Sequence, residues 1–238
     1  MLIVTLLAAC AHRTNASAAT LDGGWSSGEI SVYVLPEEEG SGPDVWLQGV
    51  GGAELSPTGS IVRRADGAVQ FRPSEGPAAT AILLRNEAGG VELLWVDDAD
   101  GQTAHHPLTR VATPSRAALE QAWVDQAAAV MAWNVEAIRT AELAHFFAFG
   151  AFLPAGAWPR PVTALTPEPV DWGEGSDFEL LGWTPDGRVR GTFQVTVAED
   201  GHDLTVHGWQ DLDGDGIPAH WTATRQVGVT QVSIDGTQ

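Results

Sequence analysis

The sequence NVEAIRTAELAHFFAFGAFL, residues 134–153, carries helix-forming residues up to Gly150. Residues 115–149 contain neither proline nor glycine and are rich in Ala, Glu, Gln and Leu. Thr113 and Pro114 have the form of an N-cap followed by proline at the first helical position, and Gly150 is placed to end the helix. The pattern predicts one helix of about 35 residues, on the order of 50 Å long.

An apolar stripe follows this predicted helix at steps of three and four residues. Its members are Val124, Ala127, Met131, Val135, Ile138, Ala141, His145 and Phe149. We interpret Glu136 and Glu142 as solvated helix positions, not catalytic carboxylates, with Glu136 and Arg139 as an i,i+3 ion pair. A helix this long cannot be covered along its whole length by a domain of about 90 residues. One half is therefore expected to contact the first domain, another chain or water.

A sheet is predicted after the helix, with four antiparallel strands at residues 178–183, 188–198, 203–209 and 220–226 and a candidate fifth at 229–234. The sequence TPDG at 184–187 has Pro and Gly in the places that a tight turn prefers, and EDGH at 199–202 makes the next turn. Period-two spacing places a set of apolar residues on the face toward the helix. These are Val189, Phe193, Val195 and Val197.

Residues 21–111 show short alternating runs separated by Gly and Pro clusters, which is typical of all-β domains. The candidate strands lie at 29–35, 45–49, 60–64, 68–72, 80–85 and 91–96. Turns are predicted at 64–67, 86–90 and 98–101, where Gly takes a positive φ. Five to eight strands joined in this way predict a small meander barrel or a folded sheet.

The chain is thus predicted to be an α+β protein. After residues 1–20, an all-β domain spans 21–111 and a long helix on a four- to five-stranded antiparallel sheet spans 113–238.

The second domain resembles the globular head of a bacterial type IV pilin over about residues 134–226. The matching features are Asn134, Ile138, TAE at 140–142, Phe146, Gly150-x-Phe152, the Pro-rich loop 154–171, DLDGDG at 211–216 and Trp221. The resemblance implies a non-enzymatic role in adhesion, scaffolding or pilus-associated assembly, with envelope or pilus-system proteins as partners. Residues 115–133 depart from the family, because charged residues stand where a pilin carries an apolar segment. Pilin-type polymerisation is therefore not expected.

The first domain is similar to lipocalin-like domains at its two ends, LDGGW at 21–25 and PLTR at 107–110. The similarity implies an alternative function, a binding module for a small apolar ligand. His105 and His106 stand next to each other, and adjacent residues of a strand face opposite ways. We therefore interpret them as an exposed polar strand or turn, not a shared metal site.

The first ten residues, MLIVTLLAAC, resemble a bacterial lipobox ending at Cys10. The resemblance implies a cleaved signal peptide, a lipid on Cys10 and an outer-membrane lipoprotein that faces the periplasm or the cell surface. Residues 11–20 are small and polar and are interpreted as a tether. Because Cys10 is the single cysteine, no intrachain disulfide forms.

The charge is strongly acidic, with 31 Asp and Glu against 12 basic residues, all of them Arg, and a net charge of -19. That balance argues against nucleic acid or an anionic membrane surface as a partner, because both repel an acidic protein. The sequence holds no Gly-x-Ser-x-Gly, no His-Glu-x-x-His and no P-loop. An enzyme is therefore not expected.

One motif suggests a metal ion. DLDGDG at 211–216 places Asp211, Asp213 and Asp215 at positions 1, 3 and 5 of a calcium loop with Gly at position 6. Position 12 is Thr222 in place of the bidentate Glu. Two interpretations stay open: a calcium site formed by the three aspartates, or a solvated connection between strands.

Overall fold

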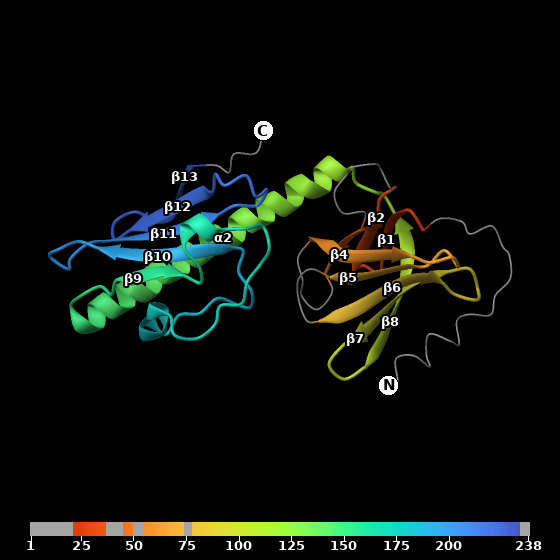
Figure 1. Ribbon diagram of the computed structural model, residues 1–238, viewed down its shortest axis with the longest axis horizontal. Coiled ribbons are helices and arrows are strands. Elements are labelled where there is room, and N and C mark those ends of the chain that lie inside the picture. Colours follow the sequence, from red (N-terminus) through yellow and green to blue (C-terminus); the bar gives the residue numbers. More distant parts are fainter. Residues whose placement is uncertain (1–20, 37–44, 50–54, 74–77, 234–238) are drawn as a thin grey trace. The chain divides into compact units, whose positions relative to one another are not determined.

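The computed structural model describes residues 21–36, 45–49, 55–73 and 78–233. The chain divides into two compact units, Met1–Gln121 and Ala122–Gln238, so their boundary falls inside the long helix α2. Figure 1 shows the β-strands of the first unit, and α2 beside the sheet of the second. The proposed signal, Cys10 and the tether lie outside the described residues. Within the described ranges, no helix has both the length and the apolar character needed to cross a membrane.

The first unit is a closed antiparallel barrel of eight strands in sequence order. The strands are β1 Gly23–Ser26, β2 Ser31–Val34, β3 Val45–Gln48, β4 Ser56–Arg63, β5 Val69–Pro73, β6 Ala79–Arg85, β7 Val91–Asp97 and β8 Thr103–Val111. Each pairs with its neighbour along the chain, and β1 closes the barrel on β8 with Trp25 opposite Arg110. The prediction of a small meander barrel is confirmed. Strands β1 and β8 were absent from the six candidate strands because glycines and exposed polar residues hide their alternation.

The two motifs with lipocalin-like character meet at the seam of the barrel. The Trp25 indole is buried, and its Nε1 donates to the Leu21 carbonyl at 2.8 Å. The Arg110 guanidinium lies over the Trp25 ring, 4.7 Å from its centre. Within β8, His105 is exposed with its Nδ1 3.7 Å from Glu92 Oε1, and His106 follows on the other face. The prediction of a polar strand at this pair is confirmed, with His105 exposed and His106 half-buried.

The barrel interior is filled by one apolar cluster of buried side chains, because alternate residues of each strand point inward. The cluster includes Trp25, Leu47, Phe71, Leu83 and Leu93, with Trp95 packed against it. The turns are those expected from the sequence. Gly67 has φ +84° and donates its N–H to the Arg64 carbonyl, and Gly89 and Gly101 also have positive φ.

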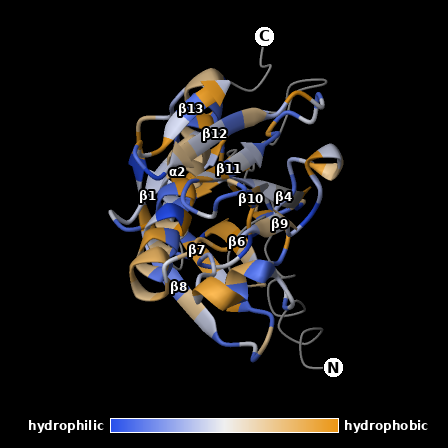
Figure 2. Ribbon diagram, turned by 90° about the vertical axis from the view of Figure 1, so that its left-hand side faces the viewer, coloured by the Kyte–Doolittle hydropathy of each residue, from blue (hydrophilic) through white to orange (hydrophobic). Residues whose placement is uncertain are grey.

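The helix α2 spans Arg116–Phe149, 34 residues, and ends at Gly150, whose φ is +81° and whose N–H donates to the Phe146 carbonyl at 2.8 Å. Its N-cap is Ser115 and not Thr113, because Ser115 Oγ accepts the Ala118 N–H at 3.2 Å. Hydropathy colouring shows both apolar and polar residues along its length (Figure 2). The predicted stripe is buried from Ala127 through Ile138.

Beyond Ile138 the stripe prediction is wrong. The buried face continues at Glu142, and Phe149 is 75% exposed. The reason is the path of the chain after Gly150, which turns back and buries Phe152 against Phe146 with ring centres 4.5 Å apart. The returning segment covers the Glu142 side of the helix and leaves Phe149 outside.

The second unit packs α2 on a five-stranded antiparallel sheet in the order β13-β12-β11-β10-β9. The strands are β9 Ala155–Trp158, β10 Gly191–Val197, β11 Leu204–Gln210, β12 Ala219–Thr224 and β13 Thr230–Ser233. Val189, Phe193 and Val195 are buried with Met131, Val135 and Ile138 in one cluster, as predicted, and Val197 packs against it. A short 3-10 helix, η2 Val162–Ala164, follows β9.

One predicted strand, at 178–183, is wrong: this segment forms the 3-10 helix η3, Asp177–Leu181. Gly182, with φ +64°, ends it, and its N–H donates to the Glu179 and Phe178 carbonyls. The edge of β10 that the predicted strand would have used is occupied by β9, which pairs Trp158 with Phe193. Strand β9 lies in the segment assigned to a loop, because its sequence, AGAW, has no alternation to reveal it.

Candidate functional site

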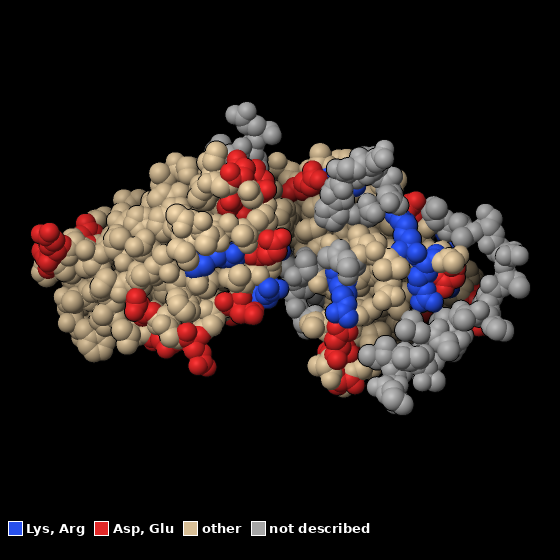
Figure 3. Space-filling view, in the orientation of Figure 1, with Lys and Arg blue, Asp and Glu red and all other residues tan. Residues whose placement is uncertain are grey.

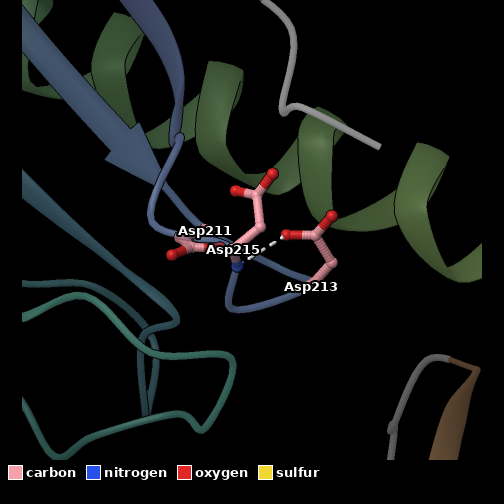
Figure 4. A group of neighbouring side chains, drawn as sticks. All are labelled: Asp211, Asp213 and Asp215. Carbon is pink, nitrogen blue, oxygen red and sulfur yellow. Dashed lines mark hydrogen bonds between the residues drawn. The ribbon is translucent and has the colours of Figure 1, made fainter. Parts of the chain in front are cut away.

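The acidic loop between β11 and β12 brings the three predicted metal ligands together (Figure 4). Asp211, Asp213 and Asp215 each offer a carboxylate oxygen, and these atoms lie within 4.8 Å of one another. Calcium binds oxygen at about 2.3–2.6 Å, so two oxygens on one ion are at most about 5 Å apart. The spacing of the three carboxylates therefore suits a calcium ion.

Asp211 is not solvated, contrary to the interpretation of three solvated aspartates. Its side chain is only 2% exposed because the loop winds around it. One carboxylate oxygen accepts the Gly214 N–H at 2.8 Å and the other accepts the Gly216 N–H at 3.1 Å. A buried carboxylate is expensive unless such hydrogen bonds satisfy it. Asp211 thus holds the loop shape before any cation is considered.

Asp213 and Asp215 are exposed and make local hydrogen bonds of the same kind. Asp213 Oδ1 accepts the Asp215 N–H at 3.0 Å, and Asp215 Oδ1 accepts the Ile217 N–H at 2.7 Å. Each carboxylate oxygen keeps a further lone pair for a cation. Thr222, at position 12 of the motif, lies in β12 opposite His207 and supplies no carboxylate. The acidic ligands of this loop are therefore the three aspartates.

Glu142 is a second group that sequence reasoning placed incorrectly. Its side chain is 0% exposed, Oε2 accepts the Leu153 N–H at 3.0 Å, and Oε1 is buried without a hydrogen-bond partner. Burial raises the pKa of the Glu142 carboxyl, against the opposing effects of the Leu153 hydrogen bond and nearby His145. The predicted Glu136–Arg139 pair is confirmed, with 2.7 Å between Arg139 Nη1 and Glu136 Oε1.

A third group, on the sheet face opposite the buried residues of β11, was missed. We call it the His–Trp cluster: His207, Trp209 and His220. Their rings are nearly parallel, with centres 5.1 Å apart for His207 and Trp209, 4.8 Å for Trp209 and His220, and 5.4 Å for the two histidines. His207 Nδ1 lies 3.1 Å from His220 Nε2. Burial lowers the pKa of both imidazoles, and the neighbouring His220 lowers that of His207 further.

The sequence pattern could reveal only part of this cluster. Alternation in β11 puts His207 and Trp209 on one face, but His220 joins them through the register that pairs it with Trp209 across the strands. That register is a property of the folded sheet.

Charge around these groups is uneven. Strands β10, β11 and β12 contain no Asp, Glu or Arg, although the chain as a whole is strongly acidic. In the view of Figure 3, acidic side chains of the second unit lie around a broad area without charged atoms. Cations therefore meet a negative overall field but no charged competitor on these three strands.

No protein-family model matches the sequence, and no curated protein or solved structure matches it.

Proposed function

We propose that this protein is a non-enzymatic envelope lipoprotein whose second unit is a pilin-like head that serves adhesion, scaffolding or pilus-associated assembly. The observation that carries the proposal is the packing of α2 on an antiparallel sheet, through Met131, Val135 and Ile138. This arrangement agrees with the order of helix, loop and strands that the pilin-like residues imply. The first half of α2 has no apolar run suited to a filament core, which favours a tethered protein over a pilus subunit.

An assembly role needs a surface that a partner protein can contact. On α2, Trp133 is 62% exposed and Val130 is 43% exposed. The two residues are three positions apart and so lie side by side on the helix surface. Trp is frequent among residues that dominate binding energy. We assign the partner contact to this part of α2.

Site-specific photo-cross-linking tests the assignment. A benzophenone amino acid replaces Trp133 in one variant and Ile217 in a matched control, since Ile217 is 60% exposed but lies in the loop between β11 and β12. We expect a discrete adduct with an envelope protein from position 133 and none from 217. Equal labelling at both positions, or no adduct at 133, would contradict the assignment.

The lipoprotein part of the proposal is tested separately. Cells that express the chain are labelled with a tagged palmitate, with Cys10→Ser as the comparison. Label on the wild type that the substitution abolishes supports a lipid anchor at Cys10. An unlabelled wild type, or equal label on both proteins, defeats it.

A second function, binding of a small apolar ligand, is favoured by the closed eight-stranded barrel, since barrels of this size hold one small ligand in some families. The packed interior, with Phe71 and Leu93 fully buried, weighs against a roomy cavity. Titration with a fluorescent fatty acid tests whether the barrel binds such a ligand. Saturable binding that Leu93→Trp abolishes would favour the ligand function, and an unsaturable signal would end it.

A further inference from the structure

The C-terminal end of α2 carries the two most exposed large apolar side chains among the residues that the structure describes. Phe147 is 83% exposed and Phe149 is 75% exposed, and every residue from 147 to 151 is exposed. A helix packed along a sheet alternates buried and exposed positions, so this unbroken exposed run means that the last turn projects beyond the packed part. We call residues 147–151 the apolar tip. Figure 1 shows this end of α2 at the margin of the second unit.

Contacts around the apolar tip hold it in shape. His145 Nδ1 donates to the Ala151 carbonyl at 2.8 Å, and the Gly150 N–H donates to the Phe146 carbonyl at 2.8 Å. Beneath the tip, the Phe152 ring stacks on Phe146. Carbonyls at a helix end often lack intrahelical partners, and an unpaired carbonyl is costly to remove from water. The two bonds satisfy carbonyls on both sides of the turn, so the tip presents its phenyl rings from a fixed and partly satisfied backbone.

The chain around the apolar tip is uncharged. Residues 143–159 contain no Asp, Glu, Lys or Arg, although 18% of the whole chain is charged. An acidic turn lies close by, between β10 and β11, where Glu199, Asp200 and Asp203 are exposed. His202 of this turn contacts Phe146 edge-on, with ring centres 6.2 Å apart. A partner that takes up the tip must therefore be apolar and must lack dense negative charge, which the acidic turn would repel.

The size and shape of the apolar tip favour a lipid bilayer over a protein as that partner. A Phe side chain offers about 150–250 Å², so the two exposed rings together present roughly 300 Å². A stable protein interface takes about 800 Å² from each partner. Phe147 and Phe149 are two positions apart and point about 200° apart around the helix. A protein groove covers one face of a helix, whereas the bilayer interface can surround a projecting end.

We propose that the apolar tip inserts into the interfacial layer of a zwitterionic phospholipid bilayer, with Phe147 and Phe149 at the level of the upper acyl chains. The net charge of -19 and the acidic turn disfavour anionic lipids. Two aromatic side chains give weak, reversible binding, as a single hydrophobic anchor does. The inference goes beyond the proposed envelope function and requires no lipid on Cys10.

Co-sedimentation with sucrose-loaded phosphatidylcholine vesicles tests the proposal. The full chain carries Cys10→Ser, so that no attached lipid contributes, and a series up to millimolar lipid gives the partition coefficient. Phe147→Ser and Phe149→Ser should each lower it about tenfold, and the double variant about 100-fold, because one phenyl group that leaves water contributes about a factor of ten or more. Replacement of part of the lipid by phosphatidylglycerol should weaken partition.

The matched control changes other exposed apolar residues of the same helix. Val130→Ser with Trp133→Ser should leave the partition coefficient unchanged, because these positions lie outside the tip. All four substituted side chains are exposed, so the variants should fold as the parent does. The proposal is overturned if the parent does not partition, if the double Phe variant partitions equally well, if only the control variant loses partition, or if binding requires anionic lipid.

A second measurement locates the inserted residue. A nitrobenzoxadiazole probe, whose emission moves to the blue in apolar surroundings, is attached to Phe147→Cys in the Cys10→Ser chain. The comparison carries the probe on Ile217→Cys, which is 60% exposed in the loop between β11 and β12. We expect phosphatidylcholine vesicles to shift the emission at 147 and not at 217. Equal shifts at both positions, or none at 147, would contradict insertion of the tip.

Discussion

The Glu142 carboxylate and the Leu153 N–H, eleven residues apart, are joined by a 3.0 Å hydrogen bond inside the second unit. The bond ties the segment that leads into β9 to the last turns of α2. Because the Glu142 side chain is fully buried and one of its oxygens has no partner, this single carboxylate both positions the chain and costs free energy when it is charged.

Glu142→Gln should make the second unit less dependent on pH. The raised pKa of Glu142 means that its contribution to stability is complete below the ordinary value of 4.5 and is lost as pH rises through the folded-state pKa. The amide keeps an acceptor for Leu153 but does not ionise.

The free energy of unfolding of the wild type, relative to the variant, should therefore increase as pH falls from 7 to 4.5. Urea denaturation followed by Trp fluorescence measures this. A difference that stays constant with pH contradicts it, and Glu120→Gln, an exposed change in the same helix, controls for net charge.

Arg139→Lys should loosen the turn between β12 and β13. Arg139 Nε donates to the Thr224 carbonyl at 2.6 Å and Nη2 donates to the Arg225 carbonyl at 3.1 Å, while its partner Glu136 accepts the Val229 N–H at 3.0 Å. An ammonium group cannot reproduce this fork. We expect a loss of about 1–3 kcal/mol, and faster hydrogen exchange at residues 224–229 than in the wild type. Unchanged exchange there would show that the fork does not hold the turn.

Gly208→Ala should destabilise the second unit by overpacking. A Cβ at this position would lie 2.6 Å from Val135 Cγ2 and 2.7 Å from Met131 Sδ, which is too close for either atom. Overpacking of a core typically costs about 1–3 kcal/mol. Gly156→Ala is the matched control, because its nearest neighbour would be Asp177 Oδ2 at 3.5 Å. Thermal melts compare the two variants. A double-mutant cycle with Val135→Ala should show a favourable coupling, and strict additivity would contradict the assigned clash.

Asp211 and Asp213 should separate loop folding from ion binding. In calcium-free buffer, Asp211→Ala should cost about 1–3 kcal/mol, since two backbone N–H groups lose their acceptor. Asp213→Ala, an exposed change, should stay within about 0.5 kcal/mol. Equal losses in urea denaturation would contradict the assignment of a structural role to Asp211 alone.

Calcium removal tests the proposed ion directly. We expect the melting temperature of the wild type to rise with calcium and to return with a chelator, because a ligand that binds only the folded state stabilises it by RT ln(1 + [L]/Kd). The shift should vanish in Asp213→Ala, which retains the Asp211 hydrogen bonds. A melt that is identical with and without chelator, up to millimolar calcium, removes calcium from the interpretation of this loop.

Local patterns were sufficient for the elements that strong periodicity or turn chemistry specifies. The absence of Pro and Gly over 115–149 predicted α2 to within a residue at each end, and Gly67, Gly89 and Gly101 marked the turns of the barrel. The segments at 155–158 and 178–183 were misassigned, because AGAW carries no alternation and the apolar residues of FELLGW suit a strand or a short helix equally well. Both segments could have paired with the same edge of β10. Residues 155–158 occupy it as β9, and residues 177–181 form a 3-10 helix instead.

The candidate sites divide in the same way. Asp211, Asp213 and Asp215 could be identified from spacing along one loop, because all three ligands are local. The fold class, the long helix, the all-β first domain and this acidic loop could likewise be predicted from local sequence patterns. The closure of β1 on β8, the burial of Glu142 and the meeting of His207, Trp209 and His220 could not. Burial and strand register are set by contacts between segments distant in the chain, and local propensity carries no record of those contacts.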